Sequence, residues 1–305
     1  MAGPVFLGVD AGGTKTRAVL LDAEGRVLAE AVAGPGNLLA VGAAVAGESL
    51  RSVVEELRVK GLRMAGGELA GAHFGVAGVG RPGDEERVRR LVEGLGLPCE
   101  FGVSDDARVA FHSVAEPPGV VLICGTGSIA VAYGVDGREV RAGGHGYLLG
   151  DEGSGYWIGR EALRAALRAE DGRGAATGLV EVVPAVLGYG SLRATVSAVY
   201  AGEVGRDRLA ALARHVLEVE DPVVAGISAE AAAELALAVR AVVARLGADA
   251  NALTLVLAGG VLRGNESLRR DLEREVSRSL PGMRFCAAEP VPAVGAAWLA
   301  LRAAG

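Results

Sequence analysis

The sequence predicts an α/β protein of two domains that arose by an internal duplication. Its 305 residues, 50% hydrophobic and 22% charged, have a globular composition and exceed the usual length of one domain. A strand–glycine loop–strand–turn–strand pattern occurs near the N-terminus and again about one domain later. Elsewhere, short apolar runs alternate with amphipathic segments, as they do in α/β proteins.

The first copy of the pattern occupies residues 5–30. Apolar residues 5–9 and 17–21 flank the loop Asp10–Thr16, and a turn at Asp22–Gly25 leads to a third strand at 26–30. β-rich residues resume directly after the glycines, where the dinucleotide fingerprint and the Walker A loop both require a helix. The sequence therefore excludes both of these nucleotide-binding motifs.

The second copy occupies residues 120–141. Apolar residues 120–124 and 129–133 flank the loop Gly125–Ser128, and a turn at 135–137 leads to a returning strand at 138–141. Two unrelated hairpins with glycines in their turns would also give this recurrence. Because these glycines lie between strands as well as at the tips, we favour duplication.

The remaining elements alternate in type. We expect strands at 70–79, 101–103, 253–258 and 283–287. We expect helices at 43–60, 84–95, after Ser104, over most of 158–218, at 229–246, at 265–280 and at 292–304. Asp84, Ser228 and Asn265 are the expected caps of three of these helices.

Composition excludes several classes of protein. The net charge of −6 disfavours a nucleic-acid partner. Three scattered cysteines fit a reducing cytoplasm better than a disulfide framework. The N-terminus lacks the basic region of a signal peptide, and the apolar runs are broken before the ~18 residues that a membrane span needs. We therefore expect a cytoplasmic protein with no membrane partner.

The first glycine loop has the residues of a phosphate site. The Asp10 carboxylate can hold hydrated magnesium, while Gly12 and Gly13 let backbone N–H groups approach phosphate oxygens and Thr14 adds a hydroxyl. An aspartate that only satisfies a tight turn is the alternative. The second glycine loop favours the phosphate site, since two loops from duplicated halves can hold one polyphosphate.

Two further segments carry polar or glycine residues at strand ends. The pair Gly259-Gly260 can line an adenine or ribose pocket, or form a plain strand-to-helix turn. Asp105 and Asp106 follow a short strand, and either of them can be only a helix cap. Alternatively, one is the general base that phosphoryl transfer to an alcohol requires.

The segment Gly143–Gly159 is rich in glycine, with seven in seventeen residues. It also contains two carboxylates, Asp151 and Glu152, and several of the scarce aromatic residues. Aromatic rings beside carboxylates suit a sugar, whose C–H face stacks while its hydroxyls form hydrogen bonds. A glycine-rich loop packed on its neighbour is the alternative.

Together these motifs resemble the N-acetylglucosamine kinase branch of the BadF/BadG/BcrA/BcrD ATPase family, in the actin/hexokinase/Hsp70 superfamily. The segments that carry the resemblance are Asp10–Thr16, Ser104–Ala107, Gly125–Ser128, Gly150–Gly159 and Ala258–Val261. The resemblance spans essentially the whole chain, and the stretch Gly150–Gly159 is specific to this branch.

The resemblance implies an α/β fold of two ribonuclease-H-like (actin-like ATPase) domains with a nucleotide cleft between them. The first domain would comprise residues 1–106 with the C-terminal helix 290–305, and the second residues 107–289 with a helical insertion. The implied activity is ATP- and Mg²⁺-dependent phosphorylation of a sugar hydroxyl, O6 of an amino sugar or N-acetylhexosamine. A homodimer is also implied.

The resemblance assigns roles residue by residue. Asp106, and not Asp105, matches the catalytic base, and Asp10 matches the magnesium ligand. The residues implied to bind ATP are Gly12, Gly13, Thr14, Lys15, Gly125, Thr126, Gly127, Gly259 and Gly260. The residues implied to bind the sugar are Asn37, Asp106, Ser128, His145, Gly146 and Asp151.

Three positions depart from the pattern of the branch. His145 stands where a Trp is usual, Ile129 where related enzymes carry Asn, and Ala11 where Gly is frequent. The first two changes alter which C2 substituent fits, so the sequence leaves the exact sugar open.

Two other functions are alternatives to the sugar kinase. An ATPase that activates a partner enzyme would need a cysteine pair for an iron–sulfur cluster. A sugar-sensing repressor would need a helix-turn-helix domain before the first loop, where nine residues precede Asp10.

Overall fold

A computed structural model of the chain describes residues 3–65, 67–79 and 83–304. The chain divides into two compact units, Met1–Glu116 with Ala287–Gly305, and Pro117–Cys286. The division expected after residue 106 falls at the start of helix α3 (Asp106–His112). In the structure the division follows Glu116, because α3 packs against α11 (Pro292–Ala304) in the first unit.

The first unit contains a five-stranded sheet in the order β3-β2-β1-β4-β5. Its strands are β1 (Val5–Ala11), β2 (Thr16–Asp22), β3 (Val27–Ala33), β4 (Leu69–Val76) and β5 (Phe101–Asp105). The first three strands form the predicted antiparallel meander. β4 and β5 run parallel to β1, so the carboxyl ends of β1, β4 and β5 lie at one edge of the sheet.

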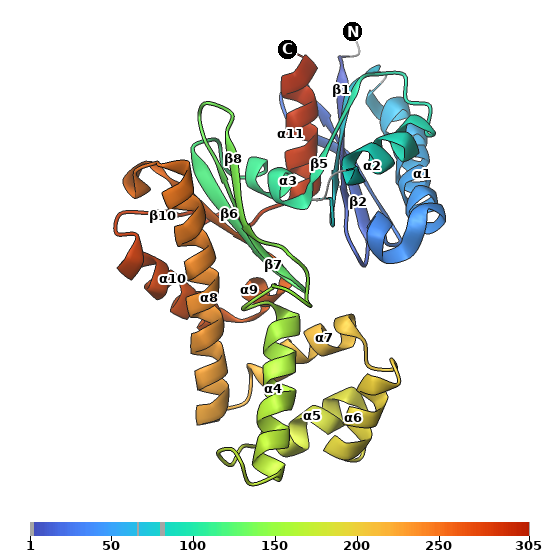
Figure 1. Ribbon diagram of the computed structural model, residues 1–305. Helices are drawn as coiled ribbons and strands as arrows, with labels where there is room; N and C mark the ends of the chain where they lie inside the picture. Colours follow the sequence, from blue (N-terminus) through green and yellow to red (C-terminus); the bar gives the residue numbers. More distant parts are fainter. Residues whose placement is uncertain (1–2, 66, 80–82, 305) are drawn as a thin grey trace. The chain divides into compact units, whose positions relative to one another are not determined.

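Alternating residues of β2 bury the two faces of this sheet under different helices. Leu20 belongs to the core beneath α1 (Leu38–Ala65), whereas Val19 and Leu21 pack against α11. Gly8 of β1 permits the close approach of α11, since a Cβ there would lie 2.1 Å from the Ala293 carbonyl oxygen. Figure 1 shows α11 lying along the sheet.

Helices α1 and α2 begin differently from the prediction. α1 starts before residue 43 and contains a break at Gly42, whose φ is 79°. In α2 (Asp84–Glu93), the N-cap position is Gly83 with φ of 88°, and Asp84 is the first helical residue. The prediction that Asp84 caps the helix is therefore wrong, although its carboxylate lies in the favourable first turn.

The second unit repeats the topology of the first. Its sheet has the order β10-β9-β6-β7-β8. The strands are β6 (Gly119–Cys124), β7 (Ser128–Tyr133), β8 (Glu139–Gly143), β9 (Thr254–Ala258) and β10 (Arg284–Phe285). β6 to β8 form an antiparallel meander, and β9 and β10 run parallel to β6. The turn glycines Gly25 and Gly137 both have φ of 80°. The predicted repeat of the strand–loop–strand pattern is confirmed at the level of topology.

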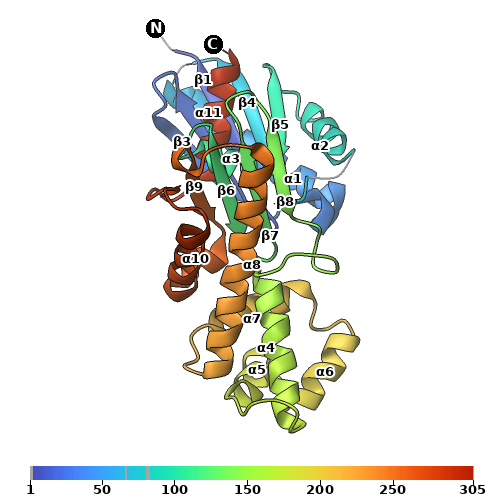
Figure 2. The ribbon, with the colours of Figure 1, turned by 60° about the vertical axis from the view of Figure 1, so that its left-hand side comes forward.

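Helices make up the rest of the second unit. They are α4 (Gly155–Glu170), α5 (Leu179–Leu187), α6 (Leu192–Tyr200), α7 (Arg206–Val216), α8 (Pro222–Leu246), the short η1 (Ala250–Ala252) and α9 (Gly260–Gly264), and α10 (Glu266–Ser279). Asn265 caps α10 as predicted, because its side chain accepts a hydrogen bond from the Leu268 N–H at 2.7 Å. Figure 2 shows α8 running beside the sheet.

Helix α8 starts seven residues earlier than the predicted residue 229. Its N-cap is Asp221, whose carboxylate accepts a hydrogen bond from the Val223 N–H at 2.7 Å, and Pro222 occupies the first turn. Ser228 lies buried inside the helix, so its predicted capping role is wrong.

By length and apolar composition, α8 also meets the criteria for a membrane-crossing helix, contrary to the expectation from the apolar runs. Its buried side chains, such as Ile227 and Leu235, belong instead to the core of the second unit, against α10 and the sheet. This is the environment of a core helix in a folded domain.

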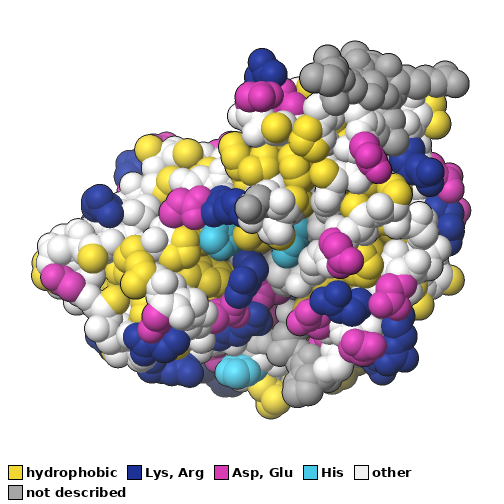
Figure 3. Space-filling model, turned by 90° about the horizontal axis from the view of Figure 1, so that it is seen from above, with side chains coloured by type: hydrophobic (Ala, Val, Ile, Leu, Met, Phe, Trp, Pro, Cys, Tyr) yellow, Lys and Arg dark blue, Asp and Glu magenta, His cyan; other side chains and the backbone are white. Residues whose placement is uncertain are grey.

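Charged side chains of both signs are interspersed on the face shown in Figure 3. Ion pairs also join near neighbours in the sequence, such as Arg26 with Asp22 and Arg90 with Glu86. Exposed pairs of this kind contribute little stability, because water and salt screen them.

Candidate active site

In the first unit, the predicted site residues lie at the carboxyl ends of the parallel strands. Asp10 is paired with Gly75 of β4, and Gly75 with Ser104 of β5, which leads directly to Asp105 and Asp106. This edge is where open α/β sheets bind ligands. The register of the strands therefore places Asp10 and Asp106, almost one hundred residues apart in the sequence, at the same edge of the sheet.

The two neighbouring aspartates occupy different positions at the start of α3. Asp105 is buried and caps α3, with its carboxylate accepting a hydrogen bond from the Arg108 N–H at 2.8 Å. Asp106 is the first residue of the helix and is half-buried. The sequence allows either aspartate to cap the helix, and the structure shows that the cap is Asp105. Asp106 therefore remains available for the predicted chemistry.

Burial raises the pKa of both carboxyl groups at this strand edge. Burial is the main cause that raises the pKa of Asp106 to about 7, and the negative charges of Asp105 and Asp10 raise it further. Burial likewise raises the pKa of Asp10 to about 6, against the opposing positive charges of Lys15 and Arg17. A carboxyl that titrates near neutral pH is suited to general-base catalysis.

The first glycine loop closes on itself next to these carboxylates. The Gly12 N–H donates to the Lys15 carbonyl at 2.9 Å, and the Asn37 N–H donates to the Gly12 carbonyl at 3.0 Å. Residues 13–15 are exposed. Gly13 has no unusual φ, and a Cβ there would meet no atom within 4 Å. The fold does not require this glycine, whereas a closely approaching ligand would.

Asn37 lies at the start of α1, beside this loop. Its side-chain oxygen accepts a hydrogen bond from the Ala40 N–H at 3.2 Å. The structure thus brings Asn37 next to Gly12, and its contact with a sugar stays a prediction.

The second glycine loop has the same construction in the second unit. The Gly125 N–H donates to the Gly127 carbonyl at 2.9 Å. The carbonyls of Gly125 and Thr126 accept hydrogen bonds from Gly155 and Tyr156, at the start of α4. A Cβ at Gly125 would again meet no atom within 4 Å. The loop is therefore held by α4, with space around its first glycine.

Asp151 lies against this second loop. Its side chain is 4% exposed. The Ser128 N–H donates to its Oδ1 at 3.3 Å, and Arg206 lies 3.4 Å from its Oδ2. Burial raises the pKa of Asp151, while the Ser128 hydrogen bond and the Arg206 charge oppose that rise. Its φ is 61°, a conformation that residues other than glycine rarely adopt outside functional or turn positions.

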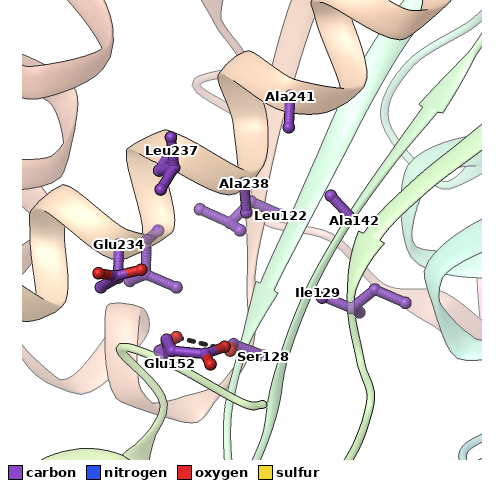
Figure 4. Close-up of a pocket in the computed structure, with 11 residues that line it drawn as sticks. Leu122, Ser128, Ile129, Ala142, Glu152, Glu234, Leu237, Ala238 and Ala241 are labelled. Atoms are coloured by element: carbon purple, nitrogen blue, oxygen red, sulfur yellow. Dashed lines mark hydrogen bonds between the residues drawn. The ribbon is translucent and has the colours of Figure 1, made fainter. Parts of the chain in front are cut away.

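Ser128 ties the loop to the glycine-rich segment. Its hydroxyl donates to the Glu152 carbonyl at 2.7 Å, drawn as a dashed line in Figure 4. A pocket of about 210 Å³ lies beside this bond, between the sheet and α8. Among its lining residues are Ile129, Glu152 and Glu234. The Ser128 hydroxyl is thus engaged by backbone, and its predicted sugar contact stays a prediction.

The structure explains several glycines of the segment Gly143–Gly159 by packing. A Cβ at Gly153 would lie 2.6 Å from the Ala231 carbonyl oxygen of α8, and one at Gly159 would lie 2.0 Å from the Leu209 carbonyl oxygen of α7. These two glycines serve the contacts of α4 and its loop. His145 and Leu148 are exposed, and Gly146 has a φ of 85° that favours glycine.

The fold requires glycine at position 259 but not at position 260. Gly259 has a φ of 99°, and a Cβ there would lie 2.2 Å from the Cys124 carbonyl oxygen at the end of β6. Gly260 begins α9, and a Cβ there would meet no atom within 4 Å. Gly259 is thus required by the fold, whereas Gly260 leaves space next to the second glycine loop.

Sequence reasoning missed Arg206. Its guanidinium contacts Asp151 and lies 5.7 Å from the centre of the Tyr147 ring. Arg206 is separated from these residues by three helices, and no local motif marks it. Each unit therefore contains one group of predicted residues. The first unit holds Asp10 and Asp106, and the second holds the loop Gly125–Ser128 with Asp151.

Two curated proteins are similar to this chain over nearly its full length. The chain is 32% identical over 301 residues to an N-acetylmuramic acid/N-acetylglucosamine kinase of Clostridium acetobutylicum, covering 96% of this chain and 97% of that protein. It is 31% identical to an N-acetyl-D-glucosamine kinase of Dictyostelium discoideum, covering 99% of each.

A solved structure shows the same fold. A protein of Chromobacterium violaceum assigned as an N-acetylglucosamine kinase matches with a TM-score of 0.75 and 27% identity, over 98% of this chain and 99% of that chain. With the two repeated sheets, this match confirms the predicted α/β class of two actin-like ATPase domains. The model of the BadF/BadG/BcrA/BcrD ATPase family matches residues 7–300, and the chain belongs to this family.

Proposed function

We propose that the protein is an ATP-dependent kinase that phosphorylates an amino sugar or N-acetylhexosamine on O6. The observation that carries the proposal is Asp106, a carboxyl with a pKa of about 7 beside Asp10 and a glycine loop. The similar proteins named as N-acetylglucosamine kinases support the class of substrate.

The two glycine loops would hold the triphosphate. Gly12–Lys15 in the first unit and Gly125–Gly127 in the second both present backbone N–H groups and an exposed threonine. Glycines with open Cβ directions, Gly13 and Gly125, support close approach of phosphate oxygens. Gly260, beside the second loop, is suited to the adenosine for the same reason.

The residues also fit a magnesium ion. Among residues 3–65, 67–79 and 83–304, no group of three or more His, Cys, Asp or Glu side chains forms a metal cage. Mg²⁺ in kinases keeps several waters and binds one or two carboxylates plus substrate phosphates, which matches the single carboxylate of Asp10. When bound, the ion would neutralise phosphate charge.

In the proposed reaction, Asp106 accepts the proton of the attacking hydroxyl. The sugar oxygen forms a bond to the terminal phosphorus as the bond from that phosphorus to the bridging oxygen breaks, and ADP leaves with the electron pair. Backbone N–H groups of both loops would stabilise the charge on the transferred group.

The sugar would contact residues of both groups. Asn37 lies beside the first loop, and His145, Gly146 and Asp151 lie in or next to the glycine-rich segment. His145 is exposed and smaller than the Trp usual in the branch, so we propose that it widens the choice of C2 substituent.

Activation of a partner enzyme through an iron–sulfur cluster has less support. Cys124 is fully buried, and burial raises the pKa of its thiol to about 12. A fully buried thiol is not accessible to an iron–sulfur cluster at the protein surface.

A coupled assay of ADP release tests the proposal. Purified protein with Mg²⁺ and ATP is offered glucosamine, N-acetylglucosamine, N-acetylmannosamine, N-acetylmuramic acid or glucose. We expect ADP release that requires an amino sugar and matches the sugar phosphate formed, mole for mole. Release of ADP that is independent of every sugar would overturn the proposal and favour an ATPase.

A further inference from the structure

Arg206 lies where the second glycine loop meets Asp151. A Cβ built on Gly127 would lie 2.8 Å from Asp151 Oδ2 and 3.0 Å from Arg206 Nη2. The guanidinium therefore borders the loop directly, and its contact with Asp151 at 3.4 Å is long for a hydrogen bond.

The fold holds Arg206 in this position. Arg206 is the first residue of α7, which packs against α4 in backbone contact at Gly159. The N-terminus of α4 is in turn bonded to the loop through Gly155 and the Gly125 carbonyl, at 2.9 Å. The Tyr147 ring lies against the guanidinium. Loop, helix and arginine thus form one connected structure within the second unit.

The charges around the second glycine loop favour a cation beside it. The loop Gly125-Thr126-Gly127-Ser128 contains no basic residue, and the buried carboxylate of Asp151 lies against it. A phosphate on this loop would be repelled by that carboxylate. A guanidinium has five N–H donors in a planar fork. Since Arg206 is 41% exposed, it retains donors that reach solvent.

We propose that Arg206 binds the terminal phosphate of the nucleotide held on the second glycine loop and offsets the charge of Asp151 there. This inference rests on the proposed kinase function. It adds a cationic side chain to a phosphate site that would otherwise consist of backbone N–H groups and hydroxyls.

Arginine 206 can be tested by nucleotide binding in the absence of any sugar. Calorimetry measures the affinity of wild type and Arg206→Gln for Mg²⁺-ADP and for Mg²⁺ with AMPPNP, whose terminal phosphate is not transferred. We expect the variant to bind AMPPNP roughly ten- to hundredfold more weakly, as loss of a charge-assisted hydrogen bond predicts. Its affinity for ADP should change less than about threefold.

Two further variants serve as controls. Arg206→Lys keeps a charge and should recover part of the lost affinity. Arg214→Gln removes an exposed arginine from the far end of the same helix and should bind both nucleotides like wild type. Equal affinities of Arg206→Gln and wild type for AMPPNP, or equal losses for ADP and AMPPNP, would overturn the inference.

Measurements of turnover distinguish a failure of this inference from a failure of the proposed kinase function. With N-acetylglucosamine and with N-acetylmuramic acid, we expect Arg206→Gln to lower kcat/KM for ATP about 10²-fold for each sugar that wild type accepts. A loss confined to the carboxylate-bearing sugar would show that Arg206 binds that carboxylate and would overturn the inference. Wild type that phosphorylates no sugar would refute the proposed function instead.

Discussion

Asp106 is the residue on which the proposed chemistry depends most. Its pKa of about 7 means that half of the carboxyls carry a proton at neutral pH. We expect kcat/KM to rise with pH through about 7, as Asp106 loses its proton and becomes a base. Asp106→Asn should lower kcat by about 10²–10⁴-fold and abolish that limb of the pH profile. Near-normal turnover in this variant would contradict the assigned role.

The same raised pKa lowers stability. The folded protein holds the Asp106 proton up to about pH 7, whereas the unfolded chain loses it near the ordinary aspartate pKa of 3.8. Between these values the folded state binds more protons, so stability falls as pH rises. Asp106→Asn should therefore raise Tm by a few degrees at pH 8, and the gain should shrink as pH falls towards 4.

Thermal melts across this pH range check the stability effect. Glu230→Gln is a suitable control, because Glu230 is exposed on α8. If Asp106→Asn raised Tm equally at every pH, or did not raise it, the Asp106 carboxyl would not be the source of the pH-dependent loss of stability.

Single residues were partly predictable from the sequence. The sequence predicts a cap or a base at Asp105 and Asp106, but only the hydrogen bond from the Arg108 N–H shows that Asp105 caps α3. Arg206 left no local signal, because its partners Tyr147 and Asp151 precede it by more than one helix. Contacts of this kind depend on packing between elements, which a single sequence does not specify.

At the scale of elements, the strand-to-helix junction after β9 supports the site. Gly259→Ala would place a Cβ against the Cys124 backbone at a φ of 99°, and we expect a loss of at least about 2 kcal/mol of stability. Gly260→Ala adds its Cβ to open space and should keep the wild-type Tm while raising KM for ATP.

Urea unfolding and ATP titrations of the two variants distinguish these roles. Equal stability losses at both positions would contradict the assignment of Gly259 to the fold and Gly260 to the ligand.

Helix boundaries show what sequence patterns can predict. The final helix, Pro292–Ala304, begins and ends where proline and the apolar periodicity predict. The sequence pattern predicts the start of α8 too late, because Ser228 is a good cap by type, whereas the helix begins at Asp221-Pro222. Asp221 also accepts hydrogen bonds from Thr177 and the Gly178 N–H, so distant residues reinforce it.

At the scale of the whole molecule, the duplication was the most predictable feature. The two hairpins share the same order of strands and loops, a glycine in the turn and the same strand directions. Such a meander is predictable because its turns and strands are encoded by residues close together in the sequence. Each predicted loop lies at the carboxyl end of a central strand, β1 or β6. The division of the chain depends on α3 docking on α11, which no local pattern encodes.

The proposed kinase requires that the loops Gly12–Lys15 and Gly125–Gly127 bind one triphosphate, with Asp106 directed at the acceptor hydroxyl. A crystal structure with AMPPNP, Mg²⁺ and N-acetylglucosamine tests it most directly. We predict phosphate oxygens about 3 Å from backbone nitrogens of both loops and a sugar hydroxyl about 3 Å from an Asp106 carboxylate oxygen. A nucleotide bound by the loop of one unit alone, or a sugar remote from Asp106, would contradict the claim.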